Sequence, residues 1–204
     1  MKKQLLQIIT FLILLTVLSA CSKTSEESKN SLSSVLAADI NNLSYYDSIE
    51  EFLAAERNIP GYENEIFYVP ALPSDKYKLI QVSKRDDIYI SVLYQVINPP
   101  PAKENLSGYD AERRQTLICQ TYLFEDSQTT LEGFLKNGHR QITYNGKTYY
   151  LWEEHAGGSF EREIIGYEIV FIRDGKLVFM HLPPADSYEN MMQFAEPEKI
   201  TAAK

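Results

Sequence analysis

Residues 166–182 read GYEIVFIRDGKLVFMHL. Asp174-Gly175 stands between two apolar runs, and such a dipeptide accepts the positive φ angles of a type I′ turn, whose twist matches paired strands. The stretch therefore predicts a β-hairpin. A second hairpin is predicted in QITYNGKTYYLW, residues 141–152, with its turn at Asn145-Gly146.

Further strands are predicted upstream of these hairpins. In IYISVLYQVI, residues 88–97, every second residue is apolar, which is the period of a strand with one buried face. Strand-like segments also occur in residues 65–70, 72–87 and 114–124.

Three short helices are predicted between and after the strands. Residues 47–58, DSIEEFLAAERN, begin with Asp47 or Ser48 as a cap, followed by glutamates at capping-box spacing. Residues 126–139 and 185–197 carry apolar side chains at helical spacing. We therefore predict an α+β domain, with an antiparallel sheet of about seven to eight strands and a few short helices packed on one face.

The chain begins with Met1-Lys2-Lys3, and residues 5–18 contain no charge. This apolar run is shorter than the roughly 20 residues that a membrane-spanning helix needs. A positive start, a short apolar core and small residues after it are typical of a secretory signal peptide.

The end of this segment, Leu18-Ser19-Ala20-Cys21, resembles the lipobox of bacterial lipoproteins at all four positions. The resemblance implies that a diacylglyceryl group is attached to Cys21 and that the chain is cut before it. We therefore expect a lipoprotein signal peptide at 1–20, a lipidated cysteine and flexible tether at 21–44, and one globular extracytoplasmic domain at 45–204. The alternatives are a secreted protein in which Cys21 is incidental, and an uncleaved transmembrane helix.

The composition limits the possible partners. Loss of residues 1–20 removes Lys2 and Lys3 but no acid, which changes the formal net charge from -8 to -10. So acidic a protein lacks the basic surface that nucleic acid requires, and anionic lipid headgroups would repel it. We expect the lipid on Cys21 to hold the protein on the outer face of the cell membrane. Cys119 then has no cysteine partner and is expected to be a small buried residue.

Two segments depart from regular patterning. Residues 22–34, SKTSEESKNSLSS, are too polar to form a core and predict a tether. Residues 98–113, NPPPAKENLSGYDAER, form a long connector with three successive prolines. Connectors of this length are commonly mobile or in contact with a ligand, and both possibilities stay open.

The richest cluster of chemical groups is WEEHAGGSFERE, residues 152–163. Glu153 and His155 share a strand face and are weak candidates for binding a metal, with His181 or His139 as a third ligand. The alternative is an ordinary solvated hairpin rim. Ser159 near His155 suggests a hydrolase, but the nucleophile elbow Gly-x-Ser-x-Gly is incomplete here. We expect no catalytic residues, no metal and no cofactor.

Four tyrosines of the C-terminal strands offer a further possibility. Tyr144, Tyr149, Tyr150 and Tyr167 either cover the core or expose an aromatic platform for a glycan or peptide.

A second resemblance covers roughly residues 45–195. The segments YVPALPSDKYKLIQV (68–82), YNGKTYY (144–150) and GYEIVFIRDGKLVFM (166–180) resemble a family of extracytoplasmic domains of unknown function. These domains occur in Gram-positive lipoproteins and on the outer side of anti-sigma-factor-like membrane proteins. The resemblance implies no catalytic residues.

The function expected from the sequence is a non-enzymatic binding or interaction module, with an envelope protein or a glycan as partner. The alternative is a sensory or regulatory ectodomain of an envelope stress or signalling system. A metal-binding protein or a hydrolase is less favoured, and a transporter's solute-binding component would need two lobes.

Overall fold

The computed structural model describes residues 43–61, 65–86, 88–123, 126–185 and 188–201. The expected signal peptide, the lipid site Cys21 and all but the end of the expected tether lie outside the described residues. Residues 44–204 form one compact unit. Within the described ranges, no helix combines the length and the apolar character needed to cross a membrane.

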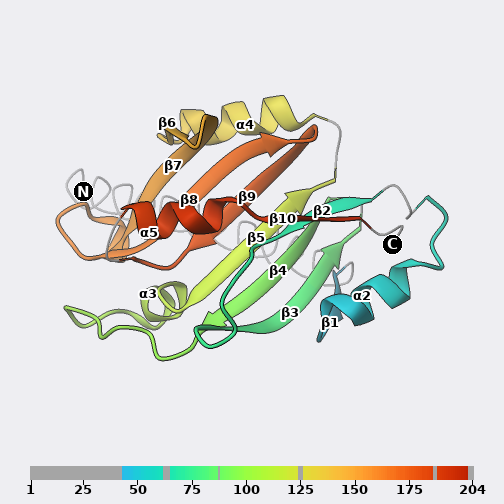
Figure 1. Ribbon diagram of the computed structural model, residues 1–204. Helices are drawn as coiled ribbons and strands as arrows, with labels where there is room; N and C mark the ends of the chain where they lie inside the picture. Colours follow the sequence, from blue (N-terminus) through green and yellow to red (C-terminus); the bar gives the residue numbers. More distant parts are fainter. Residues whose placement is uncertain (1–42, 62–64, 87, 124–125, 186–187, 202–204) are drawn as a thin grey trace, which may run out of the picture. The chain divides into compact units, whose positions relative to one another are not determined.

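An eight-stranded sheet forms the centre of this unit (Figure 1). In spatial order its strands are β1 (Leu43–Tyr46), β3 (Tyr77–Arg85), β4 (Tyr89–Val96), β5 (Thr116–Tyr122), β9 (Lys176–Leu182), β8 (Ile164–Arg173), β7 (Lys147–His155) and β6 (Arg140–Tyr144). All neighbouring pairs from β3 to β6 are antiparallel. A small antiparallel sheet of β2 (Ile66–Val69) and β10 (Glu198–Thr201) accompanies it. The prediction of an α+β fold with about eight antiparallel strands is confirmed.

Both predicted hairpins are present. The pairing of strands β8 and β9 ends at Arg173 and Lys176, which flank the turn Asp174-Gly175. The pairing of strands β6 and β7 ends at Tyr144 and Lys147, which flank the turn Asn145-Gly146. The four turn residues all have positive φ, between 49° and 75°. This is the type I′ geometry that the two dipeptides predicted.

The main core lies on the face of the sheet that carries Ile169, Phe171 and Met180. Helix α2 (Ile49–Glu56), helix α5 (Tyr188–Met192) and the small sheet contribute apolar side chains to this core. Burial of each large apolar side chain stabilises the fold by about 1.5–3 kcal/mol.

The small sheet is fixed to β5 by two hydrogen bonds. The Tyr68 N–H donates to Thr121 Oγ1 at 3.0 Å, and the Cys119 thiol donates to the Tyr68 carbonyl at 3.3 Å. Cys119 is fully buried, as expected, and burial raises the pKa of its thiol.

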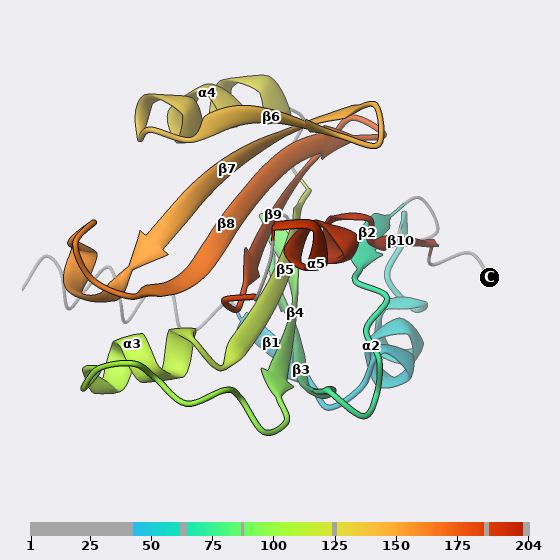
Figure 2. The ribbon, with the colours of Figure 1, turned by 60° about the vertical axis from the view of Figure 1, so that its left-hand side comes forward.

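The opposite face of the sheet carries the alternate residues Val170 and Leu177, which pack against Leu131 of helix α4 (Ser127–Lys136). The expectation that the helices share one face is therefore corrected, because α4 lies across the sheet from α5 (Figure 2). Strands β8 and β9 are apolar at consecutive positions, so both of their faces need cover. The amphipathic pattern of a helix shows which of its own sides is buried, and says nothing about which face of the sheet it covers.

The predicted cap of α2 is Ser48, whose Oγ accepts a hydrogen bond from the Glu51 N–H at 3.0 Å. The Glu51 carboxylate in turn accepts from the Asp47 N–H at 2.9 Å. These two bonds satisfy free N–H groups at the helix start, as in a capping box.

The connector 98–113 contains a helix that the sequence did not predict, α3 (Gly108–Arg113). The Ser107 Oγ accepts from the Asp110 N–H at 3.1 Å and caps its start. Helix α3 has only six residues, and its one aromatic side chain is exposed, so it has no apolar stripe. Hydrophobic periodicity therefore did not predict this helix.

Contacts with Arg114 and Glu104 hold the same connector against the sheet. The Arg114 guanidinium donates to the carbonyls of Pro100 and Pro101 at 2.6 Å and 3.1 Å. Glu104 accepts from the Glu163 N–H at 2.9 Å. The proline-rich segment and helix α3 are thereby placed beside the end of β7.

Candidate functional site

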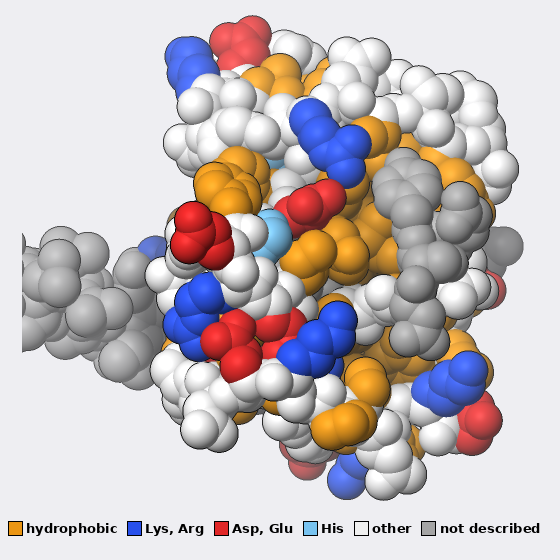
Figure 3. Space-filling model, turned by 90° about the vertical axis from the view of Figure 1, so that its left-hand side faces the viewer, with side chains coloured by type: hydrophobic (Ala, Val, Ile, Leu, Met, Phe, Trp, Pro, Cys, Tyr) orange, Lys and Arg blue, Asp and Glu red, His pale blue; other side chains and the backbone are white. Residues whose placement is uncertain are grey.

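A cavity of about 350 Å³ lies between α3 and the end of β7, and we name it the α3–β7 pocket. Its walls come from α3, from the last four residues of β7, and from the tight turn η2 (Ala156–Gly158) with the residues after it. The lining residues are Tyr109, Asp110, Trp152, Glu153, Glu154, His155, Gly157, Gly158 and Phe160. Figure 3 views the side of the molecule on which α3 and the end of β7 lie, where acidic and histidine side chains adjoin hydrophobic ones.

Aromatic side chains form much of the pocket wall. Phe160 and Tyr109 are the two most exposed large hydrophobic residues of the described chain, at 69% and 64%. The Phe160 ring meets the Trp152 ring edge-on at 5.7 Å and the His155 ring at 5.1 Å. Exposed aromatic rings gathered at one cavity are typical of a recognition surface.

Trp152 is held in place from behind. A Cβ added at Gly138 would lie 2.9 Å from Trp152 Cζ3, so the absence of a side chain at Gly138 makes room for the indole. His139 packs beside the same indole, with ring centroids 6.1 Å apart. The indole is therefore a fixed wall of the pocket.

His155 ends β7, just after a register shift between Glu154 and His155. Its Nδ1 lies 3.1 Å from the Arg162 carbonyl oxygen. A carbonyl only accepts, so Nδ1 carries the hydrogen and Nε2 of the neutral ring presents a lone pair. Nε2 is buried and makes no hydrogen bond within the described part of the chain.

The two metal candidates lie close together. Glu153 Oε2 is 3.8 Å from His155 Nε2, and Glu153 also pairs with Arg140 at 3.2 Å. The proposed third ligands, His139 and His181, instead face Glu168 and Glu154. No group of three or more His, Cys, Asp or Glu side chains suited to a metal occurs among the described residues.

Asp110 joins helix α3 to the turn after β7. Its side chain is buried, and its Oδ2 accepts from the Gly157 N–H at 3.1 Å. Gly157 has a positive φ of 59°, which suits glycine at this turn. Within the described ranges, Asp110 forms no ion pair with a basic side chain.

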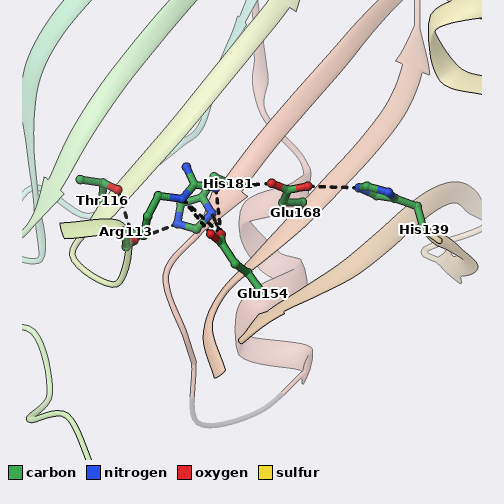
Figure 4. A network of polar contacts seen from close by, with 6 residues as sticks. All are labelled: Arg113, Thr116, His139, Glu154, Glu168 and His181. Atoms are coloured by element: carbon green, nitrogen blue, oxygen red, sulfur yellow. Dashed lines mark hydrogen bonds and ion pairs between the residues drawn. The ribbon is translucent and has the colours of Figure 1, made fainter. Parts of the chain in front are cut away.

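A network of charged side chains lies behind the pocket (Figure 4). Arg113 donates two parallel hydrogen bonds to Glu154, from Nε to Oε1 at 3.2 Å and from Nη2 to Oε2 at 2.9 Å. Arg113 Nη2 also reaches Glu168 Oε1 at 3.4 Å, and the other oxygen of Glu168 is 3.4 Å from His139 Nε2. Bidentate pairs of this kind fix geometry as well as charge.

The network holds Glu154 as a carboxylate. Burial alone would raise its pKa, but the contacts with His181 and Arg113 outweigh burial and lower the pKa from its ordinary 4.5 to about 2. At neutral pH, Glu154 is therefore a fixed negative charge that balances Arg113.

His181 lies at the deepest point of the network. Its Nε2 donates to the Arg113 carbonyl at 2.8 Å, and its Nδ1 lies 3.2 Å from Glu154 Oε2. The ring is fully buried against Gly166 of β8, where an added Cβ would come within 2.2 Å of His181 Cε1. Gly166 is thus required for the close approach of β8 to this ring.

The remaining sequence candidates lie elsewhere. Within the described chain, Ser159 has no hydrogen bond to His155, whose Nδ1 is engaged by Arg162. Tyr149 lies in the main core, Tyr144 and Tyr167 pack against it, and Tyr150 packs on the second cluster beneath α4. These four tyrosines therefore cover the two cores, which was one of the two readings open from the sequence.

The sequence reasoning missed three residues of the pocket, namely Tyr109, Asp110 and Phe160. Phe160 belongs to the charged segment 152–163, but nothing in the sequence indicates that a phenylalanine after Gly157-Gly158 is exposed. Tyr109 and Asp110 lie more than 40 positions before Trp152 in the chain. Only the folding of the connector brings them to β7.

A larger cavity of about 600 Å³ lies beside Tyr77, Arg114 and Phe194. Arg114 is engaged there by Glu163 at 3.0 Å. Among the described residues of this cavity, no buried side-chain polar atom is left without a hydrogen bond. The α3–β7 pocket is therefore the stronger candidate for a ligand site.

Comparison with protein-family models, with curated proteins and with solved structures found no match to this chain.

Proposed function

We propose that the protein is a lipid-anchored extracytoplasmic binding module, held to the cell membrane through Cys21, and that its ligand site is the α3–β7 pocket. The observation that carries the ligand site is the gathering of Tyr109 and Phe160 at one cavity, since these are the most exposed large hydrophobic residues of the described chain. Leaving such rings in water gains nothing for the fold.

The construction of the pocket also supports binding. Its back wall is rigid, because Glu154 is held by Arg113 and Trp152 is packed against Gly138. Its outer wall is a short helix and a tight turn joined by Asp110. Walls that are fixed before a ligand binds limit the entropy lost on binding. The volume of about 350 Å³ suits a small molecule or a single protruding group.

The side chains of the pocket favour binding over catalysis. His155 points its protonated nitrogen at a backbone carbonyl, and Glu154 is neutralised by Arg113. No nucleophile-base pair is formed by Ser159 and His155 in the described chain. These groups are arranged to hold a ligand by shape and hydrogen bonding.

The sole tryptophan of the chain, Trp152, lines the pocket and provides the test. Its fluorescence in the purified protein is recorded while a library of small metabolites is added. We expect ligands that change this fluorescence to bind at least tenfold more weakly to Phe160→Ala and Tyr109→Ala. Tyr45→Ala is the matched control, because Tyr45 is exposed to a similar extent but lies outside the pocket. Ligands that bind equally to all variants, or the failure of every ligand class to affect Trp152, would refute the site.

The anchor is tested separately. We expect the protein to fractionate with membranes and to carry acyl groups on its N-terminal cysteine by mass spectrometry. Replacement by serine, Cys21→Ser, should leave an uncut and unmodified chain. An unchanged mass after this replacement, apart from the substitution itself, would disprove the anchor while leaving the pocket untouched.

A further inference from the structure

Resting on the proposed ligand site, we infer that the α3–β7 pocket binds a small aliphatic amine through its primary ammonium group, held by acceptor atoms of Asp110, Glu153 and His155 and by the surrounding aromatic rings.

The pocket contains a side-chain nitrogen without a hydrogen-bond partner in the described chain, His155 Nε2. In the neutral ring, His155 Nε2 presents a lone pair when Nδ1 donates to the Arg162 carbonyl. The His155 side chain is nine-tenths buried, and its Nε2 makes no hydrogen bond in the described chain. A ligand N–H group at this point would give the nitrogen a hydrogen-bond partner. The ligand must therefore offer N–H or O–H groups at this point.

Charge then distinguishes an amine from a neutral hydroxyl compound. The lining contains three carboxylates, and none of the lining residues is lysine or arginine. Glu154 is balanced by Arg113 and Glu153 by Arg140. Asp110 forms no ion pair in the described ranges, and Arg162, which lies against Gly157, is paired with Glu104. An ammonium group on the ligand would place a positive charge opposite Asp110.

The aromatic rings favour the same ligand. Trp152, Tyr109 and Phe160 line the pocket, and a cation close to such rings is attracted by their electron-rich faces. The same rings give an apolar surface to an aliphatic chain. A quaternary ammonium would use the rings but has no N–H for His155, so a primary ammonium fits both features.

The volume limits the size of the amine. A cavity of about 350 Å³ holds about a dozen groups of the size of water. A diamine with a chain of five carbons is within this limit, and cadaverine (1,5-diaminopentane) is a suitable probe.

The experiment titrates the purified protein with cadaverine and follows Trp152 fluorescence and heat of binding. We expect saturable binding, with affinity at least tenfold higher than that for 1,5-pentanediol, which has the same chain without charge, and for pentamethonium, the doubly quaternary analogue, which has the same chain and both charges without N–H groups. Equal affinity for the diol would overturn the inference, and so would tighter binding of the quaternary amine.

Two substitutions locate the bound ammonium. Asp110→Asn keeps an oxygen for the Gly157 N–H but removes the charge, and we expect about tenfold weaker binding of cadaverine. Asp75→Asn, at an exposed position outside the pocket, is the matched control and should bind as the unaltered protein does. If Asp110→Asn fails to fold, Glu153→Gln at the more exposed pocket edge is used instead. Unchanged affinity in the folded pocket variant would overturn the inference.

The outcome also separates this inference from the proposed function. If a sugar or another neutral metabolite changes Trp152 fluorescence through Phe160 while cadaverine does not, the amine is excluded and the binding site remains. If no ligand of any class is affected by Phe160→Ala, both are refuted.

Discussion

Replacement of Glu154 by glutamine should lower the stability of the protein in a way that depends on pH. Glu154 has a pKa lowered from 4.5 to about 2, because its contacts with His181 and Arg113 outweigh its burial. At about 1.36 kcal/mol for each pKa unit, this difference corresponds to about 3 kcal/mol. Glu154 is partly exposed and solvent screens its contacts, so we expect about 2 kcal/mol at pH 7.

The sign of the pH dependence follows from linkage. The pKa of Glu154 is lower in the folded than in the unfolded chain, so its charge stabilises the fold fully above about pH 5. This stabilisation is lost as the pH falls toward 2, because Glu154 then binds a proton in both states. Glu154→Gln keeps the shape of the side chain but has no proton to bind. The difference between the two proteins should therefore fall from about 2 kcal/mol at pH 7 to about 1 kcal/mol at pH 3.

Urea unfolding of both proteins at pH 7, 5, 4 and 3, followed by Trp152 fluorescence and by circular dichroism, measures this difference. Glu153→Gln is the control on the same strand, because its partner Arg140 is exposed and the pair should contribute less than about 1 kcal/mol. A difference for Glu154→Gln that stays constant from pH 7 to pH 3, or that equals the control, would refute the stabilising role of the network.

Two further predictions concern buried positions. Gly166→Ala would place a Cβ 2.2 Å from the His181 ring and 3.0 Å from the Leu182 carbonyl, and we expect a loss of about 2–3 kcal/mol in the free energy of unfolding; an unchanged melting temperature in circular dichroism would contradict it. Cys119 is fully buried and its thiol pKa is raised, so iodoacetamide should label it only when urea unfolds the chain. Cys119→Ser gives the background in mass spectrometry, and equal labelling rates with and without urea would disprove the protection.

Local rules in the sequence predicted the features that depend on a few neighbouring residues. Asn145-Gly146 and Asp174-Gly175 mark their turns because positive φ is required at both positions of each. Ser48 marks the start of α2 because its side chain reaches an N–H three residues away. Strand alternation predicted the antiparallel sheet, and from these elements the α+β class followed.

Features that depend on residues far apart in the chain could not be predicted by the same rules. The face covered by α4 depends on the sheet residues opposite Leu131, which no pattern within α4 reveals. Helix α3 has no apolar stripe and is held instead by its Ser107 cap and by the link from Asp110 to Gly157. Strands β1 and β10 were also missed, because each has only four residues and gains its stability from a distant partner.

The class of fold, the two type I′ hairpins and the expected lipid on Cys21 could be predicted from the sequence, because each depends on residues adjacent in the chain. The tertiary structure decided the pocket. It brought Tyr109 and Asp110 from the proline-rich connector to Trp152 and His155 at the end of β7, and it placed His139 and His181 beside Glu168 and Glu154. A binding site depends on distances between side chains, and for residues far apart in the chain only the packed sheet and connector set those distances.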